Sequence, residues 1–222
     1  MKHEHELYPM LSVEEALEKV LAMFHPLEAE RLPLLETLGR VLAEDVIATG
    51  DIPPHANTAM DGYAVHAADL AGAGPESPKR LRVIENLAAG YVAAERVTPG
   101  TAIRIMTGAP LPEGADAVIP FEETHQNGEW VDCFAAVRAG VNVRLAGEDV
   151  RAGERTLARG ARIRPQEIGM LAALGYGEIS VIRRPRVAIL ATGDELVDVD
   201  APLSPGKIRN ANSYSNAAQV LQ

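Results

Sequence analysis

Between two segments that carry helical signals, the chain has a long stretch of short β-rich runs separated by glycine and proline. Residues 81–84, 101–106 and 117–121 are rich in Val, Ile and Thr. Asn127-Gly128 separates two further runs of this kind, and this dipeptide is a strong signal for a β-hairpin with a two-residue loop. Only 4% of the residues are aromatic, so the cores must consist mainly of aliphatic side chains. We therefore predict a small β domain over residues 51–144.

The segments on either side of this stretch predict a second, discontinuous domain. Ser12 and Glu15 form a capping-box signature, and apolar residues at helical spacing follow. Pro165 opens a further helix, because proline is favoured at the first helical position. We expect residues 1–50 and 145–182 to form this domain. Its predicted helices cover residues 13–24, 35–43 and 166–174, and its predicted strands cover 45–48 and 178–182.

The last forty residues have a different pattern. Residues 186–190 are a continuous apolar run, which is typical of strands buried on both faces of a parallel sheet. Acidic residues follow directly, at the end of the strand where open α/β sheets bind ligands. A turn and a helix from about Ser213 come next. One strand and one helix cannot form a doubly wound domain, so we expect residues 183–222 to be the incomplete start of an α/β domain.

Composition excludes several classes of function. The chain has 31 acidic and 21 basic residues among its 222, a formal charge of −10, which argues against nucleic-acid binding. No apolar run reaches the length of a membrane span. Cys133 is the single cysteine, so no intrachain disulfide forms, and a reducing cytoplasmic location is favoured. His3 and His5 have no further ligand nearby and are interpreted as part of a polar tail.

Asp61 is a lone carboxylate between an apolar pair and Gly62. From the residues alone, the favoured interpretation is an Asx-turn, in which the carboxylate serves only its own backbone. The alternative is a turn that holds one carboxylate at a fixed point for chemistry.

Four segments, taken together and in order, resemble the molybdopterin molybdenumtransferase (MoeA-type) family, which includes the E domain of gephyrin. The resemblance runs from about residue 11 to the end of the chain. The segments are residues 57–64 (NTAMDGYA), residues 103–110 with 112–118 (IRIMTGAP and PEGADAV), residues 142–144 with 147–149 (NVR and GED), and residues 184–196 (RPRVAILATGDEL).

The resemblance implies a fold and an activity. Family members are elongated homodimers of four domains: a helical and β domain, an inserted β domain, an α/β domain resembling molybdopterin adenylyltransferases (MogA-like), and a β barrel. This chain corresponds to the first two domains and the start of the third. The family inserts molybdenum from molybdate into adenylylated molybdopterin with Mg²⁺ and releases AMP. A non-catalytic scaffold or dimerisation module of the same fold is the alternative, and this chain alone is expected to be inactive.

The resemblance also implies partners and site residues. A second copy of the chain, a molybdopterin adenylyltransferase and molybdoenzymes are the expected partners. Asp61, Thr107 and Glu195 match catalytic positions, and Asp61 and Glu195 are expected to hold the metal. On the residues alone, a β-turn hydroxyl for Thr107 and a helix N-terminal charge for Glu195 remain open. The residues expected to bind substrate are Asp194, Lys207, Arg209 and Asn212.

Overall fold

The structure is a computed structural model that describes residues 10–221, so His3 and His5 lie outside the described residues. It is a mixed α and β fold, mostly sheet with few helices, as predicted. Two compact units are present: Arg31–Val181 forms one, and the segments before and after it form the other. The three-domain division predicted from the sequence stays a prediction.

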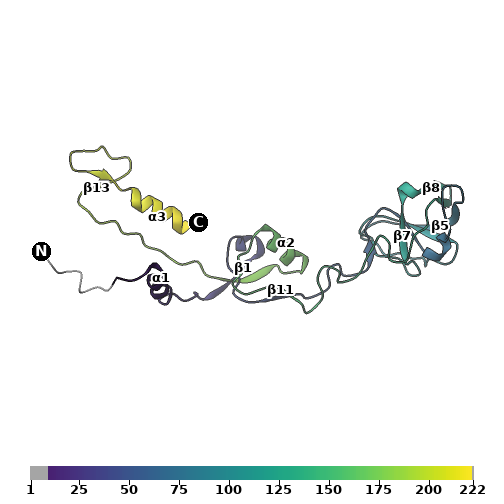
Figure 1. Cartoon of the computed structure of the whole chain (residues 1–222), viewed down its shortest axis with the longest axis horizontal. Coiled ribbons are helices and arrows are strands. Elements are labelled where there is room, and N and C mark those ends of the chain that lie inside the picture. Colours follow the sequence, from purple (N-terminus) through teal and green to yellow (C-terminus); the bar gives the residue numbers. More distant parts are fainter. Residues whose placement is uncertain (1–9, 222) are drawn as a thin grey trace. The chain divides into compact units, whose positions relative to one another are not determined.

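A six-stranded sheet is the largest element of the Arg31–Val181 unit (Figure 1). Its strand order is β7-β4-β6-β5-β9-β8, and every neighbouring pair is antiparallel except β5 and β6. The predicted hairpin is confirmed as β8 and β9, with Asn127 paired to Trp130 so that the loop is Gly128-Glu129. The strands are β4 (Gly62–Val65), β5 (Lys79–Leu87), β6 (Thr101–Ile105), β7 (Ala117–Pro120), β8 (Thr124–Asn127) and β9 (Trp130–Cys133).

Both faces of this sheet are packed against buried side chains. Successive side chains of a strand point to opposite faces, so each strand contributes to two cores. One face buries Tyr63 and Ile119, and the other buries Ala64 and Val118. As expected from the composition, aliphatic side chains dominate both clusters. Short helices and strands complete this region: η2 (Ala67–Leu70), η3 (Phe121–Glu123), and the antiparallel pair β3 (Asn57–Thr58) and β10 (Val143–Arg144).

A second core unites residues from before and after the six-stranded sheet. Leu42 and Val46 pack in one cluster with Ile163, Leu171 and other buried residues. The predicted helix after Pro165 is confirmed as α2 (Pro165–Ala173), and the strands predicted on both sides are present. Two-stranded sheets join β1 to β12 and β2 to β11. The strands are β1 (Ala29–Pro33), β2 (Val46–Ile47), β11 (Arg155–Leu157) and β12 (Glu178–Ile182).

Two secondary-structure predictions are wrong. The helix expected over 35–43 is a single 3-10 turn, η1 (Leu34–Thr37); Gly39 has a φ of 77°, and Leu42 then bridges to Val181 in β12. Pairing with distant strands therefore overrides the local helical pattern. Residues 186–190 form no strand, because no strand among residues 10–221 pairs with them.

The remaining elements belong to the other unit. Helix α1 (Val13–Leu21) has the predicted capping box: the Ser12 hydroxyl accepts from Glu15 N at 3.1 Å, and the Glu15 carboxylate accepts from Ser12 N at 2.9 Å. Strands β13 (Leu196–Val197) and β14 (Ile208–Arg209) pair in parallel, and α3 (Ala211–Leu221) starts two residues before Ser213. Within residues 10–221, no helix is long and apolar enough to cross a bilayer.

Candidate functional site

The six-stranded sheet brings Asp61 and Thr107 into contact. Asp61 directly precedes β4 and Thr107 follows β6 by two residues, and these two antiparallel strands are in register at that edge, where Gly62 pairs with Ile105. The Thr107 N–H and hydroxyl both donate to Asp61 Oδ1, each at 2.7 Å. The sequence predicted both residues as site residues, and the ladder explains why they meet.

These two hydrogen bonds keep the Asp61 carboxylate charged. The backbone N–H of Thr107, followed by its hydroxyl, lowers the pKa of Asp61, and the positive charge of Arg104 acts in the same direction. The side chain is exposed. Asp61 Oδ2 accepts no hydrogen bond from residues 10–221. The turn therefore presents an ionised carboxylate with one saturated oxygen and one oxygen open to a cation.

The backbone around Asp61 is also held in place. Phe121 N donates to the Asp61 carbonyl at 3.2 Å from the β7 side. On the preceding turn, the Thr58 hydroxyl donates to Met60 O at 2.6 Å, and Gly108 N donates to Thr58 O at 2.9 Å. The Asx-turn interpretation is therefore wrong, because the carboxylate bonds a residue 46 positions away rather than its own turn.

Two residues of this site were not predicted from the sequence. The Arg104 guanidinium lies 4.8 Å from the centroid of the Phe121 ring, in a cation–π contact. The Phe121 ring packs edge-on against the buried Tyr63, with 5.4 Å between centroids. Arg104 and Phe121 both lie within β-rich runs recognised from the sequence, but only the strand register shows that they flank Asp61.

The other predicted residues gather around β13, β14 and the start of α3. Lys207 Nζ donates to the Asp194 carbonyl, and Arg209 Nε donates to Val199 O at 2.9 Å. The Glu195 carboxylate lies against Gly193, where a Cβ would be 2.5 Å from its oxygens. Lys207 and Arg209 therefore have backbone partners here, and among residues 10–221 neither of them forms an ion pair with the carboxylate of Asp194 or Glu195.

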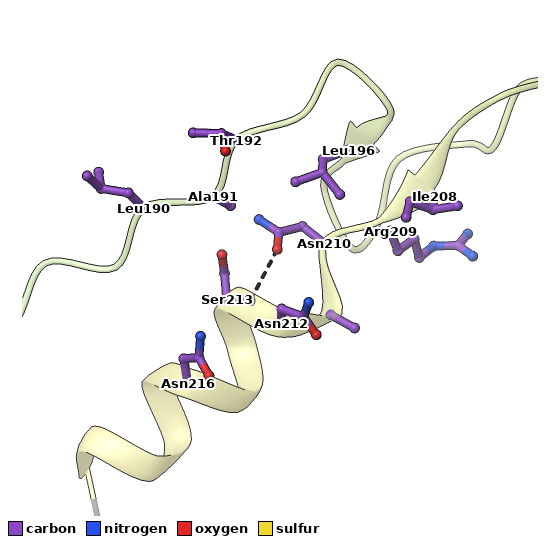
Figure 2. A pocket seen from close by; sticks show the side chains of 11 residues that line it. Leu190, Ala191, Thr192, Leu196, Ile208, Arg209, Asn210, Asn212, Ser213 and Asn216 are labelled. Carbon is purple, nitrogen blue, oxygen red and sulfur yellow. Dashed lines mark hydrogen bonds between the residues drawn. The ribbon is translucent and has the colours of Figure 1, made fainter. Parts of the chain in front are cut away.

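A pocket of about 450 Å³ opens at the N-terminal end of α3 (Figure 2). Arg209 and Asn212 line it, whereas Asp194, Glu195 and Lys207 do not. Asn210 caps the helix, since its Oδ1 accepts from Ser213 N at 3.1 Å, the bond drawn in Figure 2. Helix N-termini suit anions, and the contact of Arg209 and Asn212 with a substrate stays a prediction.

No complete metal cage is present in the part of the chain that the structure describes: no three His, Cys, Asp or Glu side chains gather at one point. Magnesium in proteins commonly uses one or two carboxylates and takes its other ligands from water and substrate phosphates. A single ionised carboxylate such as Asp61 fits that requirement. The role of Asp61 and Glu195 as metal ligands stays a prediction.

Comparison with known proteins identifies the family of this region. The family described as "MoeA N-terminal region (domain I and II)" matches residues 11–175. Molybdopterin molybdenumtransferase of Bacillus subtilis is 40% identical over 216 residues, which are 96% of this chain and 50% of the relative. Molybdopterin molybdenumtransferase 2 of Mycobacterium tuberculosis is 41% identical over 211 residues, 95% of this chain and 52% of the relative.

Solved structures agree with this match. The crystal structure of the molybdopterin biosynthesis moeA protein from Pyrococcus horikoshii OT3 superposes with a TM-score of 0.87 at 40% identity; it covers 94% of this chain and 56% of that chain. The chain spans about half the length of the curated relatives that it matches.

Proposed function

Because the chain belongs to the MoeA family, we propose that it serves in molybdenum cofactor biosynthesis as part of a molybdopterin molybdenumtransferase. The reaction takes adenylylated molybdopterin and molybdate, places molybdenum on the dithiolene sulfurs and releases AMP. The relatives that carry this name support the assignment. The structural observation that best supports the proposal is the Asp61 carboxylate, because two hydrogen bonds from Thr107 fix its position and lower its pKa.

The proposed reaction requires neutralisation of negative charge, and the Asp61 site can hold a cation for that purpose. Cleavage of a phosphoanhydride next to a second anion concentrates negative charge, which a divalent cation or fixed cationic groups must neutralise. Mg²⁺ held by Asp61 would supply that neutralisation when bound. Thr107 fixes the carboxylate through two donors, so the ligand needs no reorganisation when substrate arrives. Glu195 is the second proposed metal ligand, and Arg209 and Asn212 are proposed to contact substrate in the α3 pocket.

We further propose that the chain acts as a homodimer in the cytoplasm. Helix α1 has an apolar set of side chains with no buried member: Val13, Leu17 and Val20 are 79%, 55% and 54% exposed. A second copy of the chain would remove this surface from water. A molybdopterin adenylyltransferase and molybdoenzymes are the proposed upstream and downstream partners, because they supply the substrate and use the product.

AMP release tests the activity. The full-length molybdenumtransferase of which this chain is proposed to be a part is purified and incubated with adenylylated molybdopterin, molybdate and Mg²⁺, and AMP and reconstitution of a cofactor-free molybdoenzyme are measured. We expect Asp61→Asn to lower AMP release by at least 100-fold. The matched control Asp200→Asn removes an exposed carboxylate elsewhere and should leave the rate unchanged.

The same assay distinguishes the alternative function. If the unsubstituted protein binds both substrates and dimerises but releases no AMP, the activity proposed for it is refuted and a non-catalytic scaffold of the same fold is favoured. Equal rates for Asp61→Asn and the unsubstituted protein would remove Asp61 from the mechanism while leaving the family assignment intact.

A further inference from the structure

Asn142 has a backbone conformation that is unusual for a residue with a side chain. Its φ is 58°, and in the part of the chain that the structure describes every other residue with a positive φ is a glycine. Asparagine tolerates this region better than most residues. Such conformations persist where the surrounding structure fixes them, and they are frequent at functional sites. Two hydrogen bonds fix Asn142, and they connect two segments that both lead to Asp61.

The side-chain carboxamide of Asn142 completes the open edge of strand β7. This strand is at the end of the six-stranded sheet, next to β4. Within β7, the buried Val118 has its backbone polar groups bonded outside the sheet: its N–H donates to Val141 O at 3.1 Å, and its carbonyl accepts from Asn142 Nδ2 at 2.9 Å. Because a buried carbonyl needs a donor, the carboxamide takes the place that a backbone N–H of a further strand would have.

The backbone carbonyl of Asn142 holds the turn that precedes Asp61. It accepts a hydrogen bond from Ala59 N at 2.9 Å, two residues before the carboxylate. The next residue, Val143, pairs with Thr58 in the short ladder of β3 and β10. Asn142 therefore joins the edge of β7 to the segment that carries Asp61, with its side chain on one segment and its carbonyl on the other.

The contact between Asp61 and Thr107 depends on the place of this segment. Both donors of Thr107 reach the same carboxylate oxygen at 2.7 Å, and hydrogen bonds weaken steeply when distance and angle leave the ordinary range. Phe121, which follows β7 directly, holds the Asp61 carbonyl. A shift of the turn relative to β7 would therefore move the carboxylate away from its donors, and a misplacement of about 1 Å at a reacting group can lower a rate by about 100-fold.

We propose that Asn142 is a positioning residue for the Asp61 site, because its bonds to Val118 and Ala59 fix where the turn presents the carboxylate. Among residues 10–221, no hydrogen bond joins Asn142 to the Asp61 side chain. Its influence passes through the backbone. The consequence for catalysis rests on the proposed function, whereas the placement of the turn is independent of it.

Two variants in the full-length molybdenumtransferase separate the carboxamide from the backbone conformation. Asn142→Gly keeps the positive φ and loses the carboxamide, and Asn142→Asp keeps the shape but replaces the donor by an acceptor. We expect AMP release to fall by about 10- to 100-fold in both, through kcat and with KM unchanged, since no substrate contact is altered. The matched control is Thr101→Ala, which removes a side-chain hydrogen bond to Thr98 O at the far end of β6 and should keep the rate.

Amide hydrogen exchange in the same proteins measures the place of the turn without the reaction. The amides of Ala59 and Thr107 should exchange at least about 10-fold faster in Asn142→Gly and stay unchanged in Thr101→Ala. A mere loss of overall stability would affect both variants alike. Coupling tests the route: in an Asp61→Asn background, Asn142→Gly should lower AMP release by less than about 2-fold, because Asn142 acts through that carboxylate. Melting curves show that each variant is folded.

The proposal is overturned if folded Asn142→Gly and Asn142→Asp release AMP at the unsubstituted rate, if the exchange of Ala59 and Thr107 is unchanged, or if Asn142→Gly costs as much in the Asp61→Asn background as alone. These results are distinguishable from a failure of the proposed function. A protein that releases no AMP refutes that function, and hydrogen exchange then decides whether Asn142 fixes the turn. An active protein with normal exchange in Asn142→Gly refutes the positioning role alone.

Discussion

Replacing Gly62 by alanine should disturb the Asp61 site through the backbone. Gly62 is the first residue of β4 and pairs with both Ile105 on β6 and Pro120 on β7. A Cβ placed on Gly62 would lie 2.0 Å from the carbonyl oxygen of Ile119. That atom belongs to the backbone of a buried strand, so it cannot move aside as a flexible side chain would.

The contact distance sets the size of the effect. Ordinary carbon–oxygen contacts are about 3.5 Å, so β7 must move by more than 1 Å or the ladder must open at this point. Overpacking of a well-packed core typically costs about 1–3 kcal/mol, and the hydrogen bond from Phe121 N to the Asp61 carbonyl is the next to be lost, worth about 1 kcal/mol. We expect Gly62→Ala to destabilise the fold by about 2–4 kcal/mol.

Urea unfolding followed by Trp130 fluorescence measures this cost, and amide hydrogen exchange at Phe121 reports the local opening. Gly50→Ala is the matched control, because Gly50 has open space around its Cβ position and no positive φ; it should change the free energy of unfolding by less than about 1 kcal/mol. If the two variants unfold at the same urea concentration, or if Phe121 exchange is unaffected in Gly62→Ala, the close approach of β4 and β7 does not position Asp61.

Three further predictions concern other parts of the fold. Leu171→Ala, in the second core, should cost about 2–5 kcal/mol in urea unfolding, whereas Leu35→Ala, whose side chain is 80% exposed, should cost less than about 1 kcal/mol. The hydrogen bond from Arg164 lowers the pKa of Glu167 to about 2. A lowered pKa stabilises the fold at pH values above the ordinary carboxyl pKa, so the stability measured by thermal melts should fall as the pH drops from 4.5 to 2. Glu167→Gln should flatten that pH dependence. Burial raises the pKa of the Cys133 thiol to about 12, so a thiol reagent at pH 8 should modify Cys133 only as fast as the chain unfolds, and rapid modification of the folded protein would contradict its burial.

Local signals in the sequence predicted the local structure well. The capping box at Ser12, the proline at the start of α2 and the Asn-Gly hairpin each depend on residues within a few positions of one another, and each is present. The 35–43 segment shows the opposite case. Its apolar spacing is helical, but Leu42 instead bridges to β12 and enters a core in which Val150, Ile163 and other members come more than a hundred residues later. No local pattern carries that information.

The candidate site also contains residues that could be predicted from the sequence and residues that could not. Asp61 and Thr107 were predicted through a family resemblance, because neither residue is distinctive alone. Arg104 and Phe121 were not predicted, although each lies in a run recognised as β-rich. Their relation to Asp61 depends on the register of β4 with β6 and β7, and a shift of one residue in either pair would move one of these side chains to the other face. Register across a sheet is therefore the information that the sequence alone lacked.

The geometry of Asp61 also bears on what a complete site requires. The carboxylate is anchored from two sides, since Thr107 on the β6 side holds its oxygen and Phe121 on the β7 side holds its backbone carbonyl. Yet within residues 10–221 no three His, Cys, Asp or Glu side chains lie close enough together to hold a metal ion. A rigid cage that binds a metal on its own needs several ligands, whereas a metal that arrives with phosphates needs only one or two carboxylates. For the Mg²⁺ site proposed at Asp61, we therefore predict that the cation is held jointly with substrate, and metal affinity measured without substrate should be weak.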